Sequence, residues 1–143
     1  MRQCNIIVTE SIPDIITGKL FGVSFMNDVL KEVRERKAVD GQLIERCEYE
    51  NDLMHGVRVL WNKDGTKISE TEFKNGVMHG KHISWYLSGQ PAVETECVEG
   101  DYHGAFCAWW RNGQKREEGQ YCKGERSGQF RYWNELGDEI TEL

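Results

Sequence analysis

The chain has 143 residues, of which 38% are hydrophobic and 10% aromatic, so it is long enough for one domain and too apolar for a disordered tail. Fifteen glycines beside two prolines are typical of an ordered all-β chain with many tight turns. The net charge of −6 disfavours nucleic acid and anionic membranes as partners, because both bind clustered Lys and Arg. The charge is compatible with a basic protein partner, or it serves only to keep the protein soluble.

Residues 1–40 do not repeat in register with the rest of the chain and are predicted to form an N-terminal cap or a degenerate repeat. Residues 4–9 predict a strand. Residues 29–37 predict a short helix, because Asn27-Asp28 resembles a cap before the apolar Val29, Leu30 and Val33. Capping and partner binding stay open as alternative roles for this segment.

The cysteines and the apolar runs indicate a cytoplasmic protein with reduced thiols. Five cysteines are an odd number, and none forms a C-x-x-C pair, which fits neither a disulfide framework nor a zinc site. The N-terminal apolar run is too short for a signal peptide, and no stretch approaches the ~20 apolar residues of a membrane span.

From residue 41 to residue 143 the sequence repeats four times with a period of 24 residues and no insertion or deletion. Each unit has a glycine after a His or Ser, a tryptophan five residues further on, and a turn glycine four residues after that. The structural landmarks of the repeat are Gly56, Gly80, Gly104 and Gly128, and Trp61, Trp85, Trp109 and Trp133.

Each unit reads as a β-hairpin. Two short strand-like runs flank a glycine turn such as Asp64-Gly65, and a second glycine turn such as Asn75-Gly76 leads to the next unit. One hairpin cannot bury its apolar face alone, but stacked hairpins form a continuous sheet. The sequence therefore predicts an all-β fold, an elongated single-sheet solenoid of consecutive β-hairpins (residues 41–143) behind the N-terminal cap.

Strand alternation assigns the side chains to two faces. Val57, Val59 and Trp61 share the face that we predict to be the packed one, and the equivalent positions of the next units are apolar too. The opposite face is mixed in the early units and aromatic in the later ones.

The repeat resembles the MORN-repeat variant family. The resemblance is carried by residues 73–80 (FKNGVMHG) with the following Trp85, Gly89 and Glu94, and it recurs from residue 41 to residue 143. It implies a twisted single sheet with one concave side and no catalytic signature. Bacterial members of this type are often classed as antitoxins or immunity proteins, whereas eukaryotic MORN proteins are linked with scaffolding and phospholipids. Cys97 at a ring position and Ser127 at a His position depart from the pattern.

Three ladders of side chains invite functional interpretations. His55, His79 and His103 lie two strands apart, about 9.5 Å, which is too far for one zinc ion, so we predict a turn role and no metal site. The tryptophans are predicted to be a structural spine. The third ladder is acidic, and either ion pairs within the sheet or a stripe that docks a basic partner would explain it; its members are Glu70, Glu94, Glu118 and Glu142.

The aromatic residues outside the tryptophan ladder are the remaining candidates for partner contacts, because Tyr and Trp are enriched at interface hot spots. Covering of these rings by a curled sheet or a homodimer is the alternative. They are Tyr86, Phe106, Trp110, Phe130 and Tyr132.

No nucleophile elbow, catalytic cysteine context or phosphate-binding loop is present, so we expect a non-catalytic binding protein without cofactors. The leading hypothesis is an immunity or antitoxin-like protein that occludes a basic toxin. The alternative is a scaffold that uses the sheet for self-association or docking.

Overall fold

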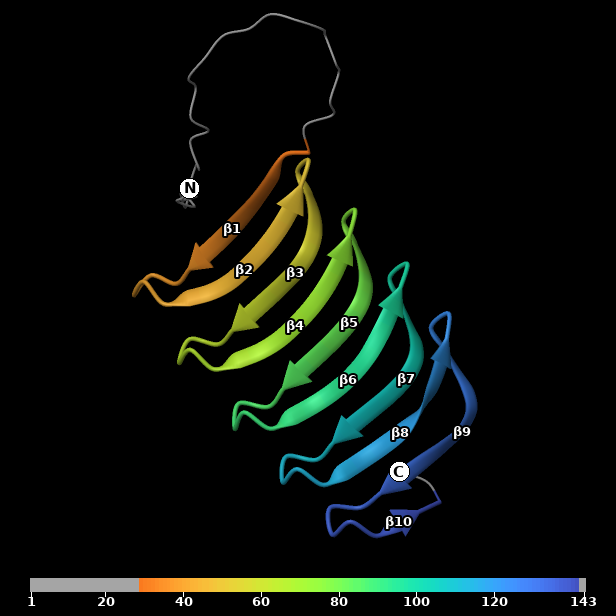
Figure 1. The fold of residues 1–143 in the computed structure, drawn as a ribbon. Coiled ribbons are helices and arrows are strands. Elements are labelled where there is room, and N and C mark those ends of the chain that lie inside the picture. Colours follow the sequence, from red (N-terminus) through yellow and green to blue (C-terminus); the bar gives the residue numbers. More distant parts are fainter. Residues whose placement is uncertain (1–28, 142–143) are drawn as a thin grey trace, which may run out of the picture.

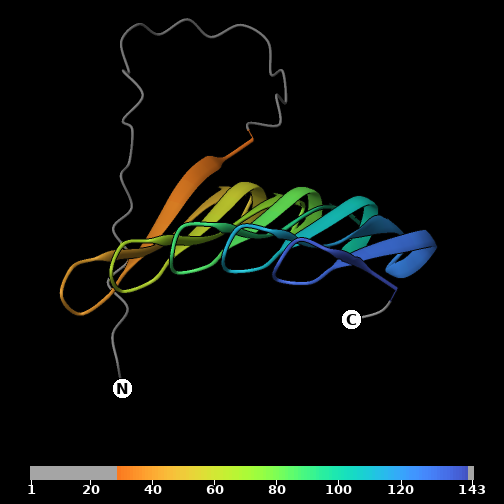
Figure 2. The same cartoon turned by 90° about the horizontal axis from the view of Figure 1, so that it is seen from below.

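The structure is a computed structural model that describes residues 29–141. Ten strands follow one another in a single antiparallel sheet whose spatial order is the chain order. Figure 1 shows the strands side by side in one curved layer, and Figure 2 shows the same hairpins from below as a row of open arcs. The strands are β1 (Lys31–Lys37), β2 (Leu43–Glu50), β3 (Leu53–Trp61), β4 (Lys67–Lys74), β5 (Val77–Trp85), β6 (Pro91–Val98), β7 (Asp101–Trp109), β8 (Lys115–Cys122), β9 (Glu125–Trp133) and β10 (Glu139–Ile140).

The predicted all-β solenoid of consecutive hairpins is confirmed. The same pairing register returns every 24 residues: Arg34 lies opposite Cys47, and Arg58 lies opposite Thr71. Within residues 29–141 there is no helix long and apolar enough to cross a membrane.

The helix predicted for residues 29–37 is wrong, because Lys31–Lys37 is strand β1 and pairs along its length with β2. The spacing of Val29, Leu30 and Val33 mimics a helical face, but backbone pairing with β2 overrides this local preference. The boundary predicted at residue 40 also falls inside the β1–β2 hairpin. The strand expected at residues 4–9 lies outside the described residues.

Glycine turns connect the strands at both ends. At the β4–β5 turn, Asn75 and Gly76 have φ values of 52° and 84°, the conformation of a two-residue type I′ hairpin turn. This turn also contacts the preceding hairpin, because the Gly76 amide donates to the Met54 carbonyl at 2.8 Å. The turns therefore help to hold successive hairpins in register.

The His-Gly motif marks a kink in the strand. Gly80 has a φ of 106°, and the Glu72 carboxylate folds over it to accept a hydrogen bond of 3.1 Å from the Lys81 amide. Glu48 accepts from the Val57 amide in the same way beside Gly56. A side chain on either glycine would collide with this carboxylate, so the sequence requires glycine there.

The most buried side chains lie on the face opposite to the one that we predicted to be packed. Among the buried residues of 29–141, only Val59 belongs to the face with the tryptophan ladder (the tryptophan face). The other buried residues lie on the opposite face (the aromatic face). They are Cys47, Thr71, Thr95, Cys97, Phe106, Ala108 and Glu117.

Candidate protein-binding surface

A continuous cluster of rings covers the aromatic face from β5 to β9. Neighbouring ring centroids are 5.2–6.5 Å apart, and three of the contacts are edge-to-face, a favourable arrangement of aromatic rings. We call this group the ring cluster; its members are His82, Tyr102, Phe106, Tyr121, Phe130 and Tyr132.

Phe106 is the foundation of the ring cluster. It is only 6% exposed and contacts both Tyr102 and Tyr121. Phe106 therefore supports the surface and is not itself available to a partner. Phe130 and Tyr132, the other two predicted contact residues of the cluster, are half-buried and present part of their rings.

Gly119 makes room for Phe130. The equivalent residues of the two preceding units are Thr71 and Thr95, and a Cβ atom on Gly119 would lie 2.6 Å from the Phe130 ring. Phe130 consequently packs directly on the strand backbone beside Tyr121. Sequence reasoning missed Gly119, although the replacement of the threonine of the two preceding units by glycine is a visible signal.

A buried charge lies beside the ring cluster. Glu117 is 4% exposed and accepts a hydrogen bond of 2.6 Å from Arg126. Arg126 also donates to the Tyr132 hydroxyl at 2.7 Å and lies 4.5 Å from the Phe130 ring centroid. Four groups therefore hold one another in fixed positions. Arg126 was not a candidate from sequence, because the equivalent positions of the preceding units hold Tyr102, Met78 and Met54. Glu117 was noted only as one of several acidic residues near the glutamate ladder, and its burial was not predicted.

His82 is the titratable member of the ring cluster. Its Nδ1 atom lies 2.8 Å from the Thr71 hydroxyl, its ring stacks near Tyr102, and burial lowers its pKa below the ordinary 6.5. Because the folded state disfavours the charged ring, His82 contributes stability above pH 6.5 that is lost as the pH falls through its folded pKa.

We therefore expect the free energy of unfolding to fall between pH 7 and pH 5 more steeply in the wild type than in His82→Gln. Urea unfolding at several pH values measures this difference. Equal slopes would show that His82 titrates alike in the folded and unfolded states.

Tyr86 and Trp110, predicted as partner contacts, are placed away from the ring cluster. Each follows the end of a strand and reaches the next hairpin: the Tyr86 hydroxyl donates to the Trp109 carbonyl at 2.7 Å, and the Trp110 indole N–H donates to the Trp133 carbonyl at 2.8 Å. Both side chains thus connect adjacent hairpins. Substituting either would disturb the sheet as well as any contact that it makes.

The glutamate ladder lies on the tryptophan face and is neutralised locally. Glu70 pairs with Lys67 at 2.8 Å, and Glu94 pairs with Lys81 at 2.8 Å. Glu118 pairs with Lys115 and with Arg131, and the hydrogen bond from Lys115 lowers its pKa. These ion pairs weaken the interpretation as an acidic stripe. Glu142 lies outside the described residues.

The tryptophan ladder is accompanied by cations. Lys67 lies 5.3 Å from the centroid of the Trp85 ring, and Lys115 lies 5.3 Å from that of Trp133. Each lysine thus links one strand to the tryptophan of a later strand through a cation–π contact.

The ladder histidines are the third residues of β3, β5 and β7, close to the turns that precede these strands. His55 Nδ1 is 3.3 Å from the Asn75 side chain of the next hairpin's turn. Within residues 29–141, no group of three or more His, Cys, Asp or Glu side chains is arranged to hold a metal ion.

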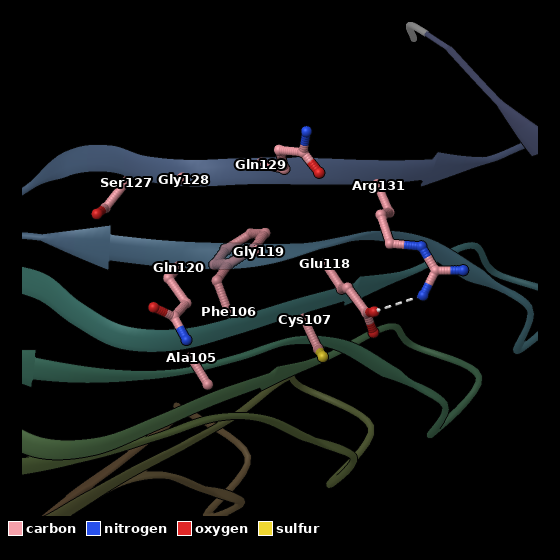
Figure 3. A pocket seen from close by; sticks show the side chains of 10 residues that line it. All are labelled: Ala105, Phe106, Cys107, Glu118, Gly119, Gln120, Ser127, Gly128, Gln129 and Arg131. Carbon is pink, nitrogen blue, oxygen red and sulfur yellow. Dashed lines mark hydrogen bonds and ion pairs between the residues drawn. The ribbon is translucent and has the colours of Figure 1, made fainter.

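A shallow hollow of about 450 Å³ lies on the tryptophan face between β7 and β9 (Figure 3). It forms because the bulkier residues of the early units are replaced by Ala105 and Cys107. Arg131 and Glu118 form an ion pair of 3.2 Å at one end, drawn as a dashed line in Figure 3. The tryptophan face is therefore hollowed in the C-terminal part of the sheet, whereas the ring cluster lies on the aromatic face.

Comparison with known families agrees with this repeat. Residues 102–123, which cover most of β7 and β8, match the family model described as MORN repeat variant. No curated protein matches the chain. The match of one hairpin, together with the 24-residue register that the other hairpins share, supports a relationship to MORN-repeat proteins.

Proposed function

We propose that the protein is a non-catalytic module that binds a protein partner through the ring cluster on the aromatic face. The observation that carries the proposal is the chain of rings across five strands of a single-layer sheet. Partly exposed aromatic surface of this kind is typical of interaction sites, and half-buried Tyr residues are typical anchors of such sites. MORN repeats, which the matched hairpin represents, are generally modules that bind proteins or membranes.

The partner that we propose is a basic toxin, which the protein neutralises by occluding its surface in the cytoplasm. Asp101 and Glu125 begin the two strands beside the ring cluster and are exposed, whereas the equivalent positions of earlier hairpins hold Leu53 and Val77. Acid thus replaces apolar residues at the turn end of two strands that carry rings, at positions that alternate to the tryptophan face, and this charge favours association with a basic surface. The four cysteines of the described residues are free thiols, as suits a reducing compartment.

Capture of partners from native lysate with tagged protein tests this function. Tyr102→Ser and Tyr132→Ser should each weaken binding of the retained partner by about 2 kcal/mol, roughly thirty-fold in Kd, because both remove half-buried rings at the surface of the cluster. Lys81→Ala on the opposite face is the matched control and should leave Kd unchanged.

Charge reversal tests the sign of the partner. Asp101→Lys with Glu125→Lys should slow association at low salt if the partner is basic. Equal affinity of the wild type and both tyrosine variants would refute docking on this face. Recovery of the bait alone as a discrete oligomer would favour the self-associating scaffold instead.

A further inference from the structure

A row of apolar side chains crosses the aromatic face at right angles to the strands, beside the two-residue turns. Facing residues of neighbouring strands contribute to it in pairs: Tyr49 lies opposite Met54, and Phe73 lies opposite Met78. Cys97 is buried, and the other members are half-buried. We call this set the apolar row; its members are Tyr49, Met54, Phe73, Met78, Cys97, Tyr102 and Tyr121. The row runs from β2 to β8, strands that lie side by side in Figure 1, and thus extends well beyond the ring cluster.

Both ends of the apolar row carry an arginine that is already paired. Arg34 lies 4.2 Å from the centroid of the Tyr49 ring and forms an ion pair with Glu32. At the other end Arg126 of β9 pairs with the buried Glu117 at 2.6 Å. Because both cations have carboxylate partners within the sheet, and burying an unpaired charge is costly, the row favours an uncharged apolar segment.

The apolar row repeats with a spacing that selects the conformation of such a segment. Met54, Met78 and Tyr102 are 24 residues apart in sequence and two strands apart in the sheet, about 9.6 Å at ~4.8 Å per strand. Three residues of a polyproline II helix span about 9.3 Å, whereas seven residues of an α-helix span about 10.5 Å. Over three hairpins the mismatch grows to about 1 Å for the polyproline II helix and to about 3 Å for the α-helix. Alternate residues of a strand are only about 6.6 Å apart and do not match at all.

Glycines and hydroxyl groups along the apolar row also suit a proline-rich segment. Phe73 lies opposite Gly56, and Tyr121 lies opposite Gly104, so no side chain fills the facing position beside either ring. Tyr102 and Tyr121 carry hydroxyl groups that can donate hydrogen bonds. The backbone of a polyproline II helix makes no internal hydrogen bonds, and its carbonyl groups therefore stay available to such donors.

We propose that the apolar row binds a proline-rich segment of the partner protein in the polyproline II conformation, which lies across strands β2–β8 with every third residue against the row. The proposal rests on the proposed function, because Tyr102 and Tyr121 belong to both surfaces. A polyproline II helix is preformed, so it docks on aromatic surfaces at a low cost in conformational entropy. About nine residues at ~3.1 Å each would cover the row, whose length is about 29 Å.

Synthetic peptides test the proposal on the full chain. The probe holds four Pro-Pro-Leu triplets, which place a leucine at every third position of a polyproline II helix. The control peptide has the same composition, with its leucines out of the three-residue spacing. We expect saturable binding of the probe and about five-fold weaker binding of the control, because only the probe presents all its leucines to the row. Methionine-methyl NMR locates the contact, since the signals of Met54 and Met78 should shift with the probe.

Substitutions in the apolar row give a second measurement. Tyr102→Ser and Met78→Ser should each weaken binding of the probe about five-fold or more, because each removes a side chain of the row. Val77→Ser is the matched control, since Val77 precedes Met78 on β5, is 45% exposed and alternates to the tryptophan face. The control should leave Kd unchanged, and the thermal midpoint of each variant checks that it is folded.

Equal binding of the two peptides would overturn the proposal, as would unshifted signals of Met54 and Met78 or equal effects of Met78→Ser and Val77→Ser. Tighter binding of a peptide with leucines at the spacing of an amphipathic α-helix would overturn it in favour of a helical segment. If the probe fails but Tyr102→Ser still weakens capture of the partner, only this inference is wrong. If the probe binds as expected but Tyr102→Ser leaves the Kd of the captured partner unchanged, the proposed function is wrong and the row still takes a proline-rich segment.

Discussion

Phe106→Ala should lower the free energy of unfolding by about 3 kcal/mol, the largest effect expected of any single ring in the sheet. Phe106 is 6% exposed and contacts Tyr102 and Tyr121, so its loss removes buried area and two aromatic contacts together. The value lies at the lower end for Phe-to-Ala changes, because water can enter a single-layer sheet and partly fill the space.

Phe73→Ala is the matched control, since Phe73 occupies the same face two hairpins earlier and is only half-buried. We expect about 1 kcal/mol for this change, in proportion to the smaller area that it buries. Urea unfolding followed by tryptophan fluorescence measures both. Equal losses in the two variants would mean that the ring cluster adds no stability beyond ordinary strand packing.

Gly80→Ala should destabilise the protein by about 2–3 kcal/mol. The φ of 106° costs an L-residue about 1–2 kcal/mol, and the new methyl group would displace the Glu72 carboxylate from the Lys81 amide, which costs about 1 kcal/mol more. Gly89→Ala separates the two contributions, because Gly89 has a φ of 86° and open space around it. The free energy of unfolding of Gly89→Ala should therefore fall only by the conformational cost of the positive φ, about 1–2 kcal/mol.

A double-mutant cycle identifies the collision. Glu72→Ala removes the carboxylate, so Gly80→Ala should cost less in the Glu72→Ala background than in the wild type. The same thermal or urea unfolding measurements suffice. Additive losses would show that Glu72 and Gly80 act independently and that the carboxylate does not explain the glycine.

The sequence was sufficient for the fold because the repeat determines the turns and the strand period. The landmarks Gly56 and Trp61 recur every 24 residues, and the register of the strands follows them. Strand β1 was missed because Lys37 and Glu32 stand where the other hairpins have these landmarks. Its strand character comes from pairing with β2, a contact that local sequence does not reveal.

The candidate surface was only partly predictable. Alternation placed Phe106, Phe130 and Tyr132 together on one face, and the structure brings them into one cluster. Alternation could not show that Phe106 is covered, because burial depends on neighbours such as Tyr121 from the next strand. Nor could it show that the Tyr86 hydroxyl is used by the next hairpin, because that contact depends on the spacing between turns.

Hydrogen exchange of the protein with and without its captured partner tests the central claim most directly. Docking on the ring cluster predicts slower exchange concentrated in β7, β8 and β9, with the Tyr102→Ser variant losing both the protection and the affinity. Protection confined to β3 to β5, and unchanged in Tyr102→Ser, would contradict the account.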